Sequence, residues 1–323
     1  MKLIIYMPAL NEAESIEVVI KSLPRSLDSV DEIQYLVIDD GSTDATASLA
    51  RTAGACVVSH GRNLGVGAAF QSAVQFGLEN DADILVGIDA DGQFDPTEIP
   101  SLIEPILHNK ADMVMGNRFA FGLPEYMPRL KYWGNQRMSQ LIHYVSGQKF
   151  QDVSCGFRAY DREALLRLNN FAGFTYTHET ILSLLFQRLR VMEVPIHVKY
   201  DPERKSRVAG SLVRYALQTS KIILRVLLDY RPMRVFGTFG GSLVIVGVLF
   251  EAFLLGHYVF TGAFSPYKSV GFIGLGFFIF GMLVLIIALI ADMLNRMRMN
   301  QDRLMYEIKK IKYVNRSDIS FKT

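Results

Sequence analysis

Two long apolar stretches, residues 236–260 and 270–290, limit most strongly what this chain can become. A helix needs about 20 consecutive apolar residues to cross the hydrocarbon core of a bilayer, and each stretch supplies that length. A soluble core would not accommodate two such runs. We therefore predict two transmembrane helices, within residues 235–291, after a water-soluble region. Glu251 lies in the first span, where a carboxylate is costly, so we expect it to face a partner helix or to lie near an interface.

The charges around the two spans predict their orientation. The linker of residues 261–269 carries only Lys268 as a cation, whereas both outer flanks are rich in cations. These are Arg225, Arg231, Arg234, Arg296, Arg298, Arg303, Lys309, Lys310 and Lys312. The positive-inside rule then predicts an inner or plasma membrane protein whose soluble domain and both termini are cytoplasmic. Residues 292–323 form a basic cytoplasmic tail, and its helical periodicity continues the second span.

Two segments outside the spans combine cations with apolar residues, as surfaces at a membrane interface do. Residues 211–234 carry one narrow polar stripe on an otherwise apolar helix, which favours an amphipathic juxtamembrane helix; packing against another subunit is the alternative. Residues 124–150 mix cations with aromatic side chains, including Trp133, and predict a surface that contacts lipid. A solvated helix with a small packed face explains this second segment nearly as well.

The first 210 residues have the pattern of one α/β domain. Short apolar runs alternate with helical patterns, which predicts a mostly parallel, Rossmann-like sheet with helices on both faces. The predicted strands are residues 3–7, 35–38, 56–59, 84–88, 113–116 and 191–198. The net charge of +2 is too small to indicate nucleic-acid binding, and two cysteines suggest a reducing compartment without a disulfide framework. The first apolar run is short and is cut by Pro8, unlike a signal peptide.

An acidic motif follows the fourth predicted strand. The run of residues 84–88 ends in Asp89-Ala90-Asp91-Gly92-Gln93. Open α/β sheets bind ligands at the carboxyl ends of their strands, and hard oxygen ligands suit a divalent cation that also holds phosphate oxygens. We therefore predict that Asp89, Asp91 and Gln93 bind Mg²⁺ or Mn²⁺. A solvated turn with acidic caps is the alternative, because Asp and Gly both favour turns.

Two further features lie at strand ends in this half of the chain. Asp39 ends the second predicted strand, where its carboxylate could accept a hydrogen bond from a nucleobase or a ribose; a helix cap is the alternative. The glycines of residues 61–67 open the next helix and could either cradle a phosphate or allow tight packing. They do not follow the first strand, as the dinucleotide fingerprint requires, so packing is favoured.

Three acidic motifs in order resemble glycosyltransferase family 2. They are Pro8-Ala9-Leu10-Asn11-Glu12, Asp39-Asp40-Gly41-Ser42-Thr43-Asp44 and the motif from Asp89 to Gln93. Members of this family have the GT-A fold, invert the sugar configuration, and use nucleotide-sugar donors and a divalent metal. The likeness covers the chain to about residue 211 and is strongest to the polyprenyl-phosphate glycosyltransferases, which include dolichol-phosphate mannose synthases and bacterial undecaprenyl-phosphate glucosyltransferases. The two-span layout matches the glucosyltransferase branch.

The resemblance implies roles for residues on the donor side. The residues that would line the nucleotide pocket are Pro8, Ala9, Glu12 and Asp39. Asp89, Asp91 and Gln93 would hold the metal against the diphosphate, and Arg118 would lie near the donor phosphates; a solvated surface arginine is the alternative. The resemblance also implies a homo-oligomer, a tetramer.

On the acceptor side, the segment from Asp152 to Arg158 resembles the acceptor motif of the family. The implied acceptor is a phosphate that is already ionised at neutral pH, so no proton must be removed before it attacks. Asp152 is therefore expected to orient the acceptor site through Arg158, with a role as general base as the alternative. Glu179 is another candidate base, but an acidic residue near a helix start is explained more simply by the helix dipole.

A basic loop, residues 201–211, resembles the mobile loop of the family that closes on phosphates. Arg207 and Gly210 match that pattern, whereas Leu212 stands where the family has serine and the following lysine is absent. Arginine binds phosphate through two parallel hydrogen bonds. The resemblance thus implies that Arg204, Arg207 and Arg158 contact the acceptor phosphate, and that Arg207 contributes to catalysis together with Asp91 and Asp152.

Taken together, these features predict a metal-dependent enzyme that moves glucose from UDP-glucose to a polyprenyl phosphate at the cytoplasmic membrane face. Transfer of mannose from GDP-mannose, or of another sugar, is the alternative. A processive polysaccharide synthase would need more spans and a Gln-x-x-Arg-Trp motif, and neither is found. A catalytically inactive scaffold that binds a nucleotide sugar is disfavoured by the intact acidic motifs.

Overall fold

The structure is a computed structural model that describes residues 1–169, 176–200, 228 and 231–313. The basic loop with Arg204 and Arg207 and nearly all of the predicted amphipathic helix therefore lie outside the described residues. The chain divides into two compact units. Unit 1 comprises Met1–Leu212 together with Asp302–Thr323, and unit 2 comprises Val213–Gln301.

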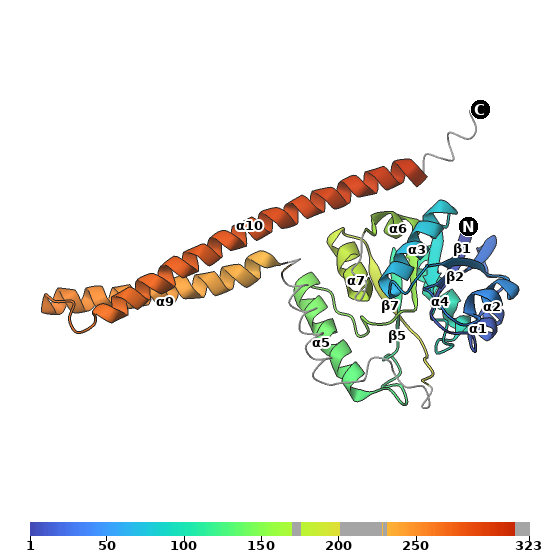
Figure 1. The fold of residues 1–323 in the computed structure, drawn as a ribbon, viewed down its shortest axis with the longest axis horizontal. Helices are drawn as coiled ribbons and strands as arrows, with labels where there is room; N and C mark the ends of the chain where they lie inside the picture. Colours follow the sequence, from blue (N-terminus) through green and yellow to red (C-terminus); the bar gives the residue numbers. More distant parts are fainter. Residues whose placement is uncertain (170–175, 201–227, 229–230, 314–323) are drawn as a thin grey trace. The chain divides into compact units, whose positions relative to one another are not determined.

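Unit 1 is built on a seven-stranded sheet with the strand order β3-β2-β1-β4-β6-β5-β7 (Figure 1). The strands are β1 (Lys2–Ala9), β2 (Glu32–Asp39), β3 (Cys56–Ser59), β4 (Ile84–Gly87), β5 (Met113–Asn117), β6 (Arg158–Asp161) and β7 (Val191–Pro195). All neighbouring pairs are parallel except the two that involve β6, which runs antiparallel between β4 and β5. The predicted mostly parallel sheet is confirmed, while β6 was not predicted.

Helices cover both faces of the sheet, as predicted (Figure 1). They are α1 (Ile16–Ser22), α2 (Thr46–Thr52), α3 (Val66–Glu79), the short 3-10 helix η1 (Pro96–Glu98), α4 (Ile99–Leu107), α5 (Arg129–Ser146), α6 (Arg162–Arg167) and α7 (Tyr176–Phe186). Alternate side chains of β1 point to opposite layers because the side-chain period of a strand is two. Ile5 joins a core with Ile16 of α1 and Leu102 of α4, whereas the Tyr6 ring lies 6.1 Å from that of Phe70 in α3.

The order of the strands fixes where a ligand can bind. The chain passes from β1 through β2 to β3 on one side and then returns to β4 on the other side of β1. Such a reversal opens a crevice at the carboxyl ends of the strands. The register pairs Ala9 with Asp39 and Tyr6 with Gly87, so the segments after β1, β2 and β4 all leave the sheet at this edge.

Among its described residues, unit 2 contains the two helices α9 (Pro232–Thr261) and the first part of α10 (Lys268–Tyr313), and both are long and apolar enough to cross a membrane. The two helices approach closely at glycines. A Cβ added to Gly281 would lie 2.9 Å from the Gly240 carbonyl oxygen, and one added to Gly274 would lie 3.1 Å from Oε1 of Glu251. Glu251 thus faces the neighbouring helix, which confirms the expectation for this carboxylate, and small residues permit the contact.

Helix α10 continues without interruption from the second predicted span to Tyr313, as the periodicity indicated. Its residues from Asp302 onward belong to unit 1, where they contact α6. The sequence predicts that residues 292–323 form a basic tail whose helical periodicity continues the second span. In the structure, the part from Asp302 to Tyr313 is the last stretch of this expected helix, and it docks on the sheet-bearing unit, which was not predicted.

Candidate active site

The acidic motif after β4 forms one half of the site. The turn is held from two sides, because the Ser15 hydroxyl donates to the Ala90 carbonyl at 2.8 Å and the Gln93 amide donates to Oδ1 of Asp91 at 3.1 Å. Burial and the nearby charge of Asp91 raise the pKa of Asp89 to about 6. Gly156 leaves room for this carboxylate, since an added Cβ would lie 3.2 Å from Oδ1 of Asp89.

These residues suit a divalent cation. Asp89 and Asp91 are hard oxygen ligands whose mutual repulsion a cation would relieve, and Gln93 supplies an amide oxygen. Within the described part of the chain, no group of three or more His, Cys, Asp or Glu side chains forms a closed metal cage. Mg²⁺ usually keeps several waters and binds through one or two carboxylates together with phosphate oxygens, which is compatible with a site built on Asp89 and Asp91.

The predicted nucleotide residues lie side by side at the ends of β1 and β2. Asp39 is 5% exposed, and its Oδ1 accepts a hydrogen bond of 2.9 Å from the Ser42 amide, so it caps the turn that follows it. The Glu12 amide donates to the Thr46 hydroxyl at 2.8 Å, which ties the segment after β1 to the start of α2. The pairing of β1 with β2 thus brings Pro8 and Ala9 close to Asp39, and Glu12 follows on the segment that is bound to the start of α2.

Two backbone amides of the glycine-rich segment before α3 bond to a protein carboxylate, which supports packing over a phosphate cradle. Asp40 accepts hydrogen bonds from the amides of Leu64 and Gly65 at 2.9 and 2.8 Å, and its Oδ1 lies 2.7 Å from Nδ1 of His60. A Cβ added to Gly41, which has φ of +82°, would lie 2.6 Å from the backbone of Arg62. This close approach and the left-handed backbone both require glycine at position 41.

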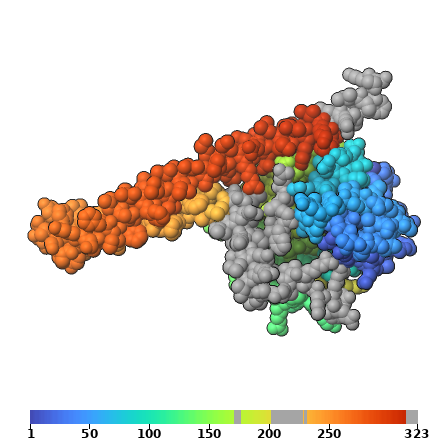
Figure 2. Space-filling view, in the orientation of Figure 1, coloured from blue at the N-terminus to red at the C-terminus, as the bar shows by residue number. Residues whose placement is uncertain are grey.

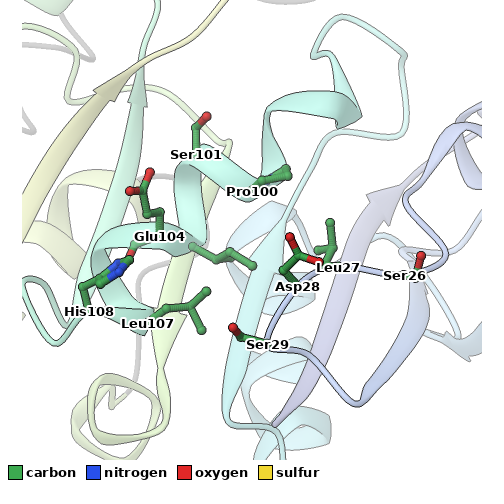
Figure 3. A pocket seen from close by; sticks show the side chains of 10 residues that line it. Ser26, Leu27, Asp28, Ser29, Pro100, Ser101, Glu104, Leu107 and His108 are labelled. Carbon is green, nitrogen blue, oxygen red and sulfur yellow. The ribbon is translucent and has the colours of Figure 1, made fainter.

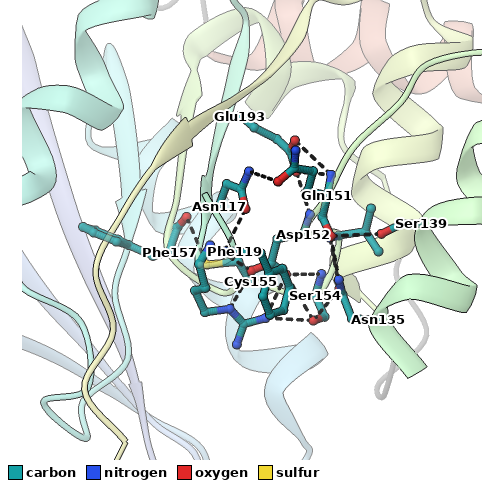
Figure 4. A network of polar contacts seen from close by, with 12 residues as sticks. Asn117, Phe119, Asn135, Ser139, Gln151, Asp152, Ser154, Cys155, Phe157 and Glu193 are labelled. Carbon is teal, nitrogen blue, oxygen red and sulfur yellow. Dashed lines mark hydrogen bonds and ion pairs between the residues drawn. The ribbon is translucent and has the colours of Figure 1, made fainter. Parts of the chain in front are cut away.

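The other half of the site is built on a buried ion pair between Arg118 and Asp152. Nε and Nη2 of Arg118 donate to the two carboxylate oxygens of Asp152 at 2.6 and 2.8 Å. Burial alone would lower the pKa of Arg118, but the hydrogen bonds and the charge of Asp152 raise it above its ordinary value. Figure 4 shows the surrounding network, in which Glu193 accepts from the amides of Gln151 and Asp152.

This arrangement corrects two predictions on the acceptor side. Asp152 orients Arg118 and not Arg158. Arg158 is completely buried and donates to the carbonyl oxygens of Cys155, Val153 and Thr177 and to the Thr180 hydroxyl. Because these N–H groups already donate to backbone carbonyls and a hydroxyl, Arg158 stabilises the fold and is not available to bind an acceptor phosphate. Burial also raises the pKa of the Cys155 thiol to about 12, so Cys155 packs and does not react.

Lys131 and Tyr200 also belong to the half of the site that contains the Arg118–Asp152 ion pair. Neither was predicted as part of the site. Burial, together with the charge of Arg118, lowers the pKa of Lys131, against the opposing effect of the carboxylates of Asp89, Asp152 and Asp91. The Tyr200 hydroxyl accepts from Nη1 of Arg118 at 3.0 Å, and Nζ of Lys131 lies 5.1 Å from the centre of the Tyr200 ring. Lys131 lies in the first turn of α5, within a segment rich in cations and aromatics, so no local pattern distinguished it from its neighbours.

The start of α7 lies close to this network. Glu179 falls in the first turn of α7, where the helix dipole favours an acidic residue. Burial and the charge of Arg158 lower the pKa of His178 to about 3, so its ring is neutral at physiological pH. The helix dipole accounts for an acidic residue at the position of Glu179, and the neutral ring of His178 carries no charge that would attract a phosphate.

A separate pocket lies between the loop of residues 26–29 and α4 (Figure 3). Its polar lining includes Asp28, Ser101, Glu104 and His108. The loop precedes β2 and the end of α4 precedes β5, so this pocket lies at the amino edge of the sheet, opposite the edge that carries Asp89. It contains none of the predicted site residues.

Comparisons with known proteins agree with this geometry. A family model described as Glycosyl transferase family 2 matches residues 4–168. Glycosyltransferase AglJ of Haloferax volcanii is 26% identical over 305 residues, which cover 94% of this chain and 96% of that protein. The undecaprenyl-phosphate mannosyltransferase of Micrococcus luteus is 29% identical over 232 residues, which cover 67% of this chain and 91% of that protein.

A solved structure is similar to this chain over most of its length. Glucosyl-3-phosphoglycerate synthase from Mycobacterium tuberculosis, in complex with Mn²⁺, UDP-glucose and phosphoglyceric acid, is similar with a TM-score of 0.54 and 26% sequence identity. The likeness covers 70% of this chain and 78% of that one. The GT-A expectation is thereby confirmed, and the acidic motif lies on a fold that has been solved with a metal and a nucleotide sugar bound.

Proposed function

The chain belongs to glycosyl transferase family 2, and from this premise we propose that it transfers a sugar from a nucleotide sugar to a polyprenyl phosphate at the cytoplasmic face of a membrane. One observation carries the proposal: the carboxylate of Asp89, next to that of Asp91, lies within electrostatic reach of the buried Arg118 and the half-buried Lys131. A site for two phosphate-bearing substrates needs both a metal-binding half and a cationic half.

The proposed donor is UDP-glucose. The two candidate spans match the layout expected for polyprenyl-phosphate glucosyltransferases, and the solved relative from Mycobacterium tuberculosis was crystallised with UDP-glucose. GDP-mannose is the alternative, because relatives in Micrococcus luteus and Mycolicibacterium smegmatis are named as mannosyl and monophosphomannose enzymes. Pro8, Ala9, Glu12 and Asp39 would bind the nucleotide in either case.

Asp89, Asp91 and Gln93 would hold Mg²⁺ or Mn²⁺ against the donor diphosphate. When bound, such a cation neutralises the charge that develops on the leaving diphosphate. The Ser15 hydroxyl and the Gln93 backbone amide hold the acidic turn in place. The carboxylates of Asp89 and Asp91 are therefore already positioned at the crevice where the diphosphate would bind.

The acceptor phosphate is already ionised, so the site must offset its negative charge and does not need a general base to remove a proton. An ionised phosphate oxygen attacks the anomeric carbon, the bond from that carbon to the diphosphate oxygen breaks with its electron pair on the nucleoside diphosphate, and the sugar configuration inverts. Two unit charges 4 Å apart repel by about 1 kcal/mol in water and by about 4 kcal/mol near a protein surface. Lys131 and Arg118 are the described cations that would offset this repulsion, and Asp152 would hold Arg118 in place.

Arg204 and Arg207 remain proposed ligands of the acceptor phosphate, although they lie outside the described residues. The lipid would approach through the membrane that α9 and α10 are proposed to span, with both termini in the cytoplasm. On unit 1, exposed aromatic side chains lie before and within α5, and these are proposed to contact lipid. They are Phe121, Tyr126 and Trp133, which are 66%, 67% and 45% exposed. A homo-oligomer is likewise proposed.

The test is direct transfer of labelled sugar. Membranes that contain the protein are incubated with a polyprenyl phosphate and, in parallel, labelled UDP-glucose, GDP-mannose or UDP-N-acetylglucosamine, and the lipid extract is counted. We expect label from UDP-glucose in an extractable product. Label from GDP-mannose alone would select the alternative donor, and no lipid-linked label from any donor would overturn the proposed function.

A further inference from the structure

The C-terminal part of α10 has one face occupied by unit 1. The Tyr306 hydroxyl donates to Oε2 of Glu163 at 3.2 Å, and the Arg167 guanidinium lies 4.4 Å from the centre of the Tyr306 ring. Further contacts of the same face are Asn169 with Asp302, Lys309 with the Leu168 carbonyl, and Arg162 with the Tyr313 carbonyl. Figure 2 shows these last turns of α10, in red, on the surface of unit 1. The contacting residues recur every three to four positions, so they define one side of the helix.

The opposite side carries an apolar stripe that the chain leaves open. We call it the heptad stripe: Leu294, Met297, Gln301, Leu304, Ile308 and Ile311. Five of these six residues are apolar and are between 50% and 65% exposed. Their spacing alternates between three and four residues, which is the repeat of the a and d positions in a coiled coil. The docked residues fall at the b and f positions, on the far side of the helix from the stripe.

The bilayer does not account for the heptad stripe. The predicted span ends at residue 290, and a helix rises about 1.5 Å per residue, so Leu304 lies about 21 Å further along the axis and Ile311 further still. Beyond the hydrocarbon core the headgroup region adds only about 5 to 8 Å on each side. The larger part of the stripe therefore stands in water on a continuous helix.

We propose that the heptad stripe pairs with the same stripe of a second copy of this chain, in a parallel two-stranded coiled coil. Both copies enter the membrane in the same orientation, so only a parallel pair is available. In such a pair a g residue faces the e residue five positions later on the other helix. Glu307 is at g and Lys312 is at e, so each Glu307 meets Lys312 of the second copy, and the single polar a residue, Gln301, fixes the register.

The charges and the packing are compatible with this pairing. Glu307 and Lys312 are both exposed, and in the single chain Lys312 contacts only its neighbour Tyr313, with Nζ 2.8 Å from the hydroxyl, among the described contacts. Because the docked face and the heptad stripe are on opposite sides, pairing does not compete with the contacts to α6. The inference is independent of the sugar, the acceptor and the reaction.

Disulfide trapping tests the pairing. In a Cys56→Ser background, which leaves only the buried Cys155, Leu304→Cys and Ile311→Cys each place one thiol at a d position. Lys310→Cys is the matched control, because it is exposed and lies at the c position. After mild oxidation in native membranes, we expect a dimer band on non-reducing gels for both d-position variants and little for the control. Monomer only, or equal dimer from Lys310→Cys, would overturn the proposal.

Charge reversal gives a second, independent arm. Introduced into the Leu304→Cys protein, Glu307→Lys should lower the trapped fraction by roughly twofold to fivefold, since two exposed ion pairs per dimer are lost. Adding Lys312→Glu restores opposite charges and should return the fraction to its starting value. A double variant that traps no better than Glu307→Lys alone would exclude the parallel g-to-e pairing. Sugar transfer is not measured, so this outcome does not depend on the proposed function.

Discussion

Arg118 and Asp152 form a two-pronged ion pair, Nε to Oδ2 at 2.6 Å and Nη2 to Oδ1 at 2.8 Å, with 5% and 0% of their side chains exposed. The pair is neutral as a unit, and it fixes the plane of the guanidinium group. Lys131 stands beside it with no carboxylate bonded to it among the described contacts, so it is the cation best placed to receive a phosphate.

Replacing Asp152 by Asn should both destabilise the protein and reduce transfer. Removing one partner of a buried pair costs about 3–5 kcal/mol, because the other charge is left buried and uncompensated. Thermal unfolding of the purified protein measures the first effect. Asp112→Asn is the matched control: Asp112 pairs with Arg190, whose side chain is 50% exposed, so the loss should be smaller and transfer should persist. If Asp152→Asn unfolds like wild type and binds donor normally but is inactive, Asp152 acts as a base and not as an orienting residue.

A methyl group at position 156 should weaken metal activation. A Cβ there lies 3.2 Å from Oδ1 of Asp89, so Gly156→Ala displaces a carboxylate that is proposed to bind the cation. Changes to groups that support metal ligands cost about 10–100-fold in metal affinity. The Mn²⁺ concentration needed for half-maximal transfer should therefore rise by about tenfold, measured against Gly61→Ala, whose added Cβ meets nothing within 4 Å. An unchanged Mn²⁺ requirement would contradict the position of the metal site.

Acceptor binding should weaken at alkaline pH because of Lys131. Burial and Arg118 lower the pKa of this lysine, so its positive charge is complete below that pKa and is lost as pH rises through it, earlier than for an ordinary lysine. The KM for polyprenyl phosphate should rise over this range, while kcat at saturation changes less. Lys131→Arg keeps its charge and should move the rise to higher pH. A pH profile identical in the variant would mean that Lys131 does not contact the acceptor.

Thiol labelling tests the proposed orientation in the membrane. Cys56 is exposed on unit 1, and in intact cells it should react with a membrane-impermeant thiol reagent only after permeabilisation. A cysteine at Ser265, between α9 and α10, should react from outside in a Cys56→Ser background. Labelling of Cys56 but not of Ser265→Cys in intact cells would reverse the topology.

The sequence predicted the architecture because the apolar runs and their acidic ends are local patterns. It did not predict β6, whose residues Arg158–Asp161 include two charged side chains and become a strand only because they pair with β4 and β5. Such pairing joins distant parts of the sequence, so the local hydrophobic periodicity does not indicate it.

The partner of Asp152 was missed for the same reason. Arg158 is six residues away in sequence, yet its N–H groups turn inward to backbone carbonyls, while Arg118 reaches Asp152 from the end of β5, 34 residues earlier. The sequence does not distinguish Lys131 from the cations around it, because its partial burial depends on the contact between α5 and the segment after β7. The docking of α10 on α6 also depends on such distant contacts, although the helix itself was expected.

The most direct test of the account is the amount of lipid-linked sugar formed by wild type and by Asp91→Asn at equal protein levels, with and without chelator. We predict that the wild type transfers label to the polyprenyl phosphate, that excess chelator abolishes this labelling, and that Mn²⁺ or Mg²⁺ restores it. Asp91→Asn should lower the labelling by about 10²–10³-fold, as losing one charge-stabilising group does elsewhere. Equal labelling by Asp91→Asn, or transfer that persists in excess chelator, would contradict the assignment of this site.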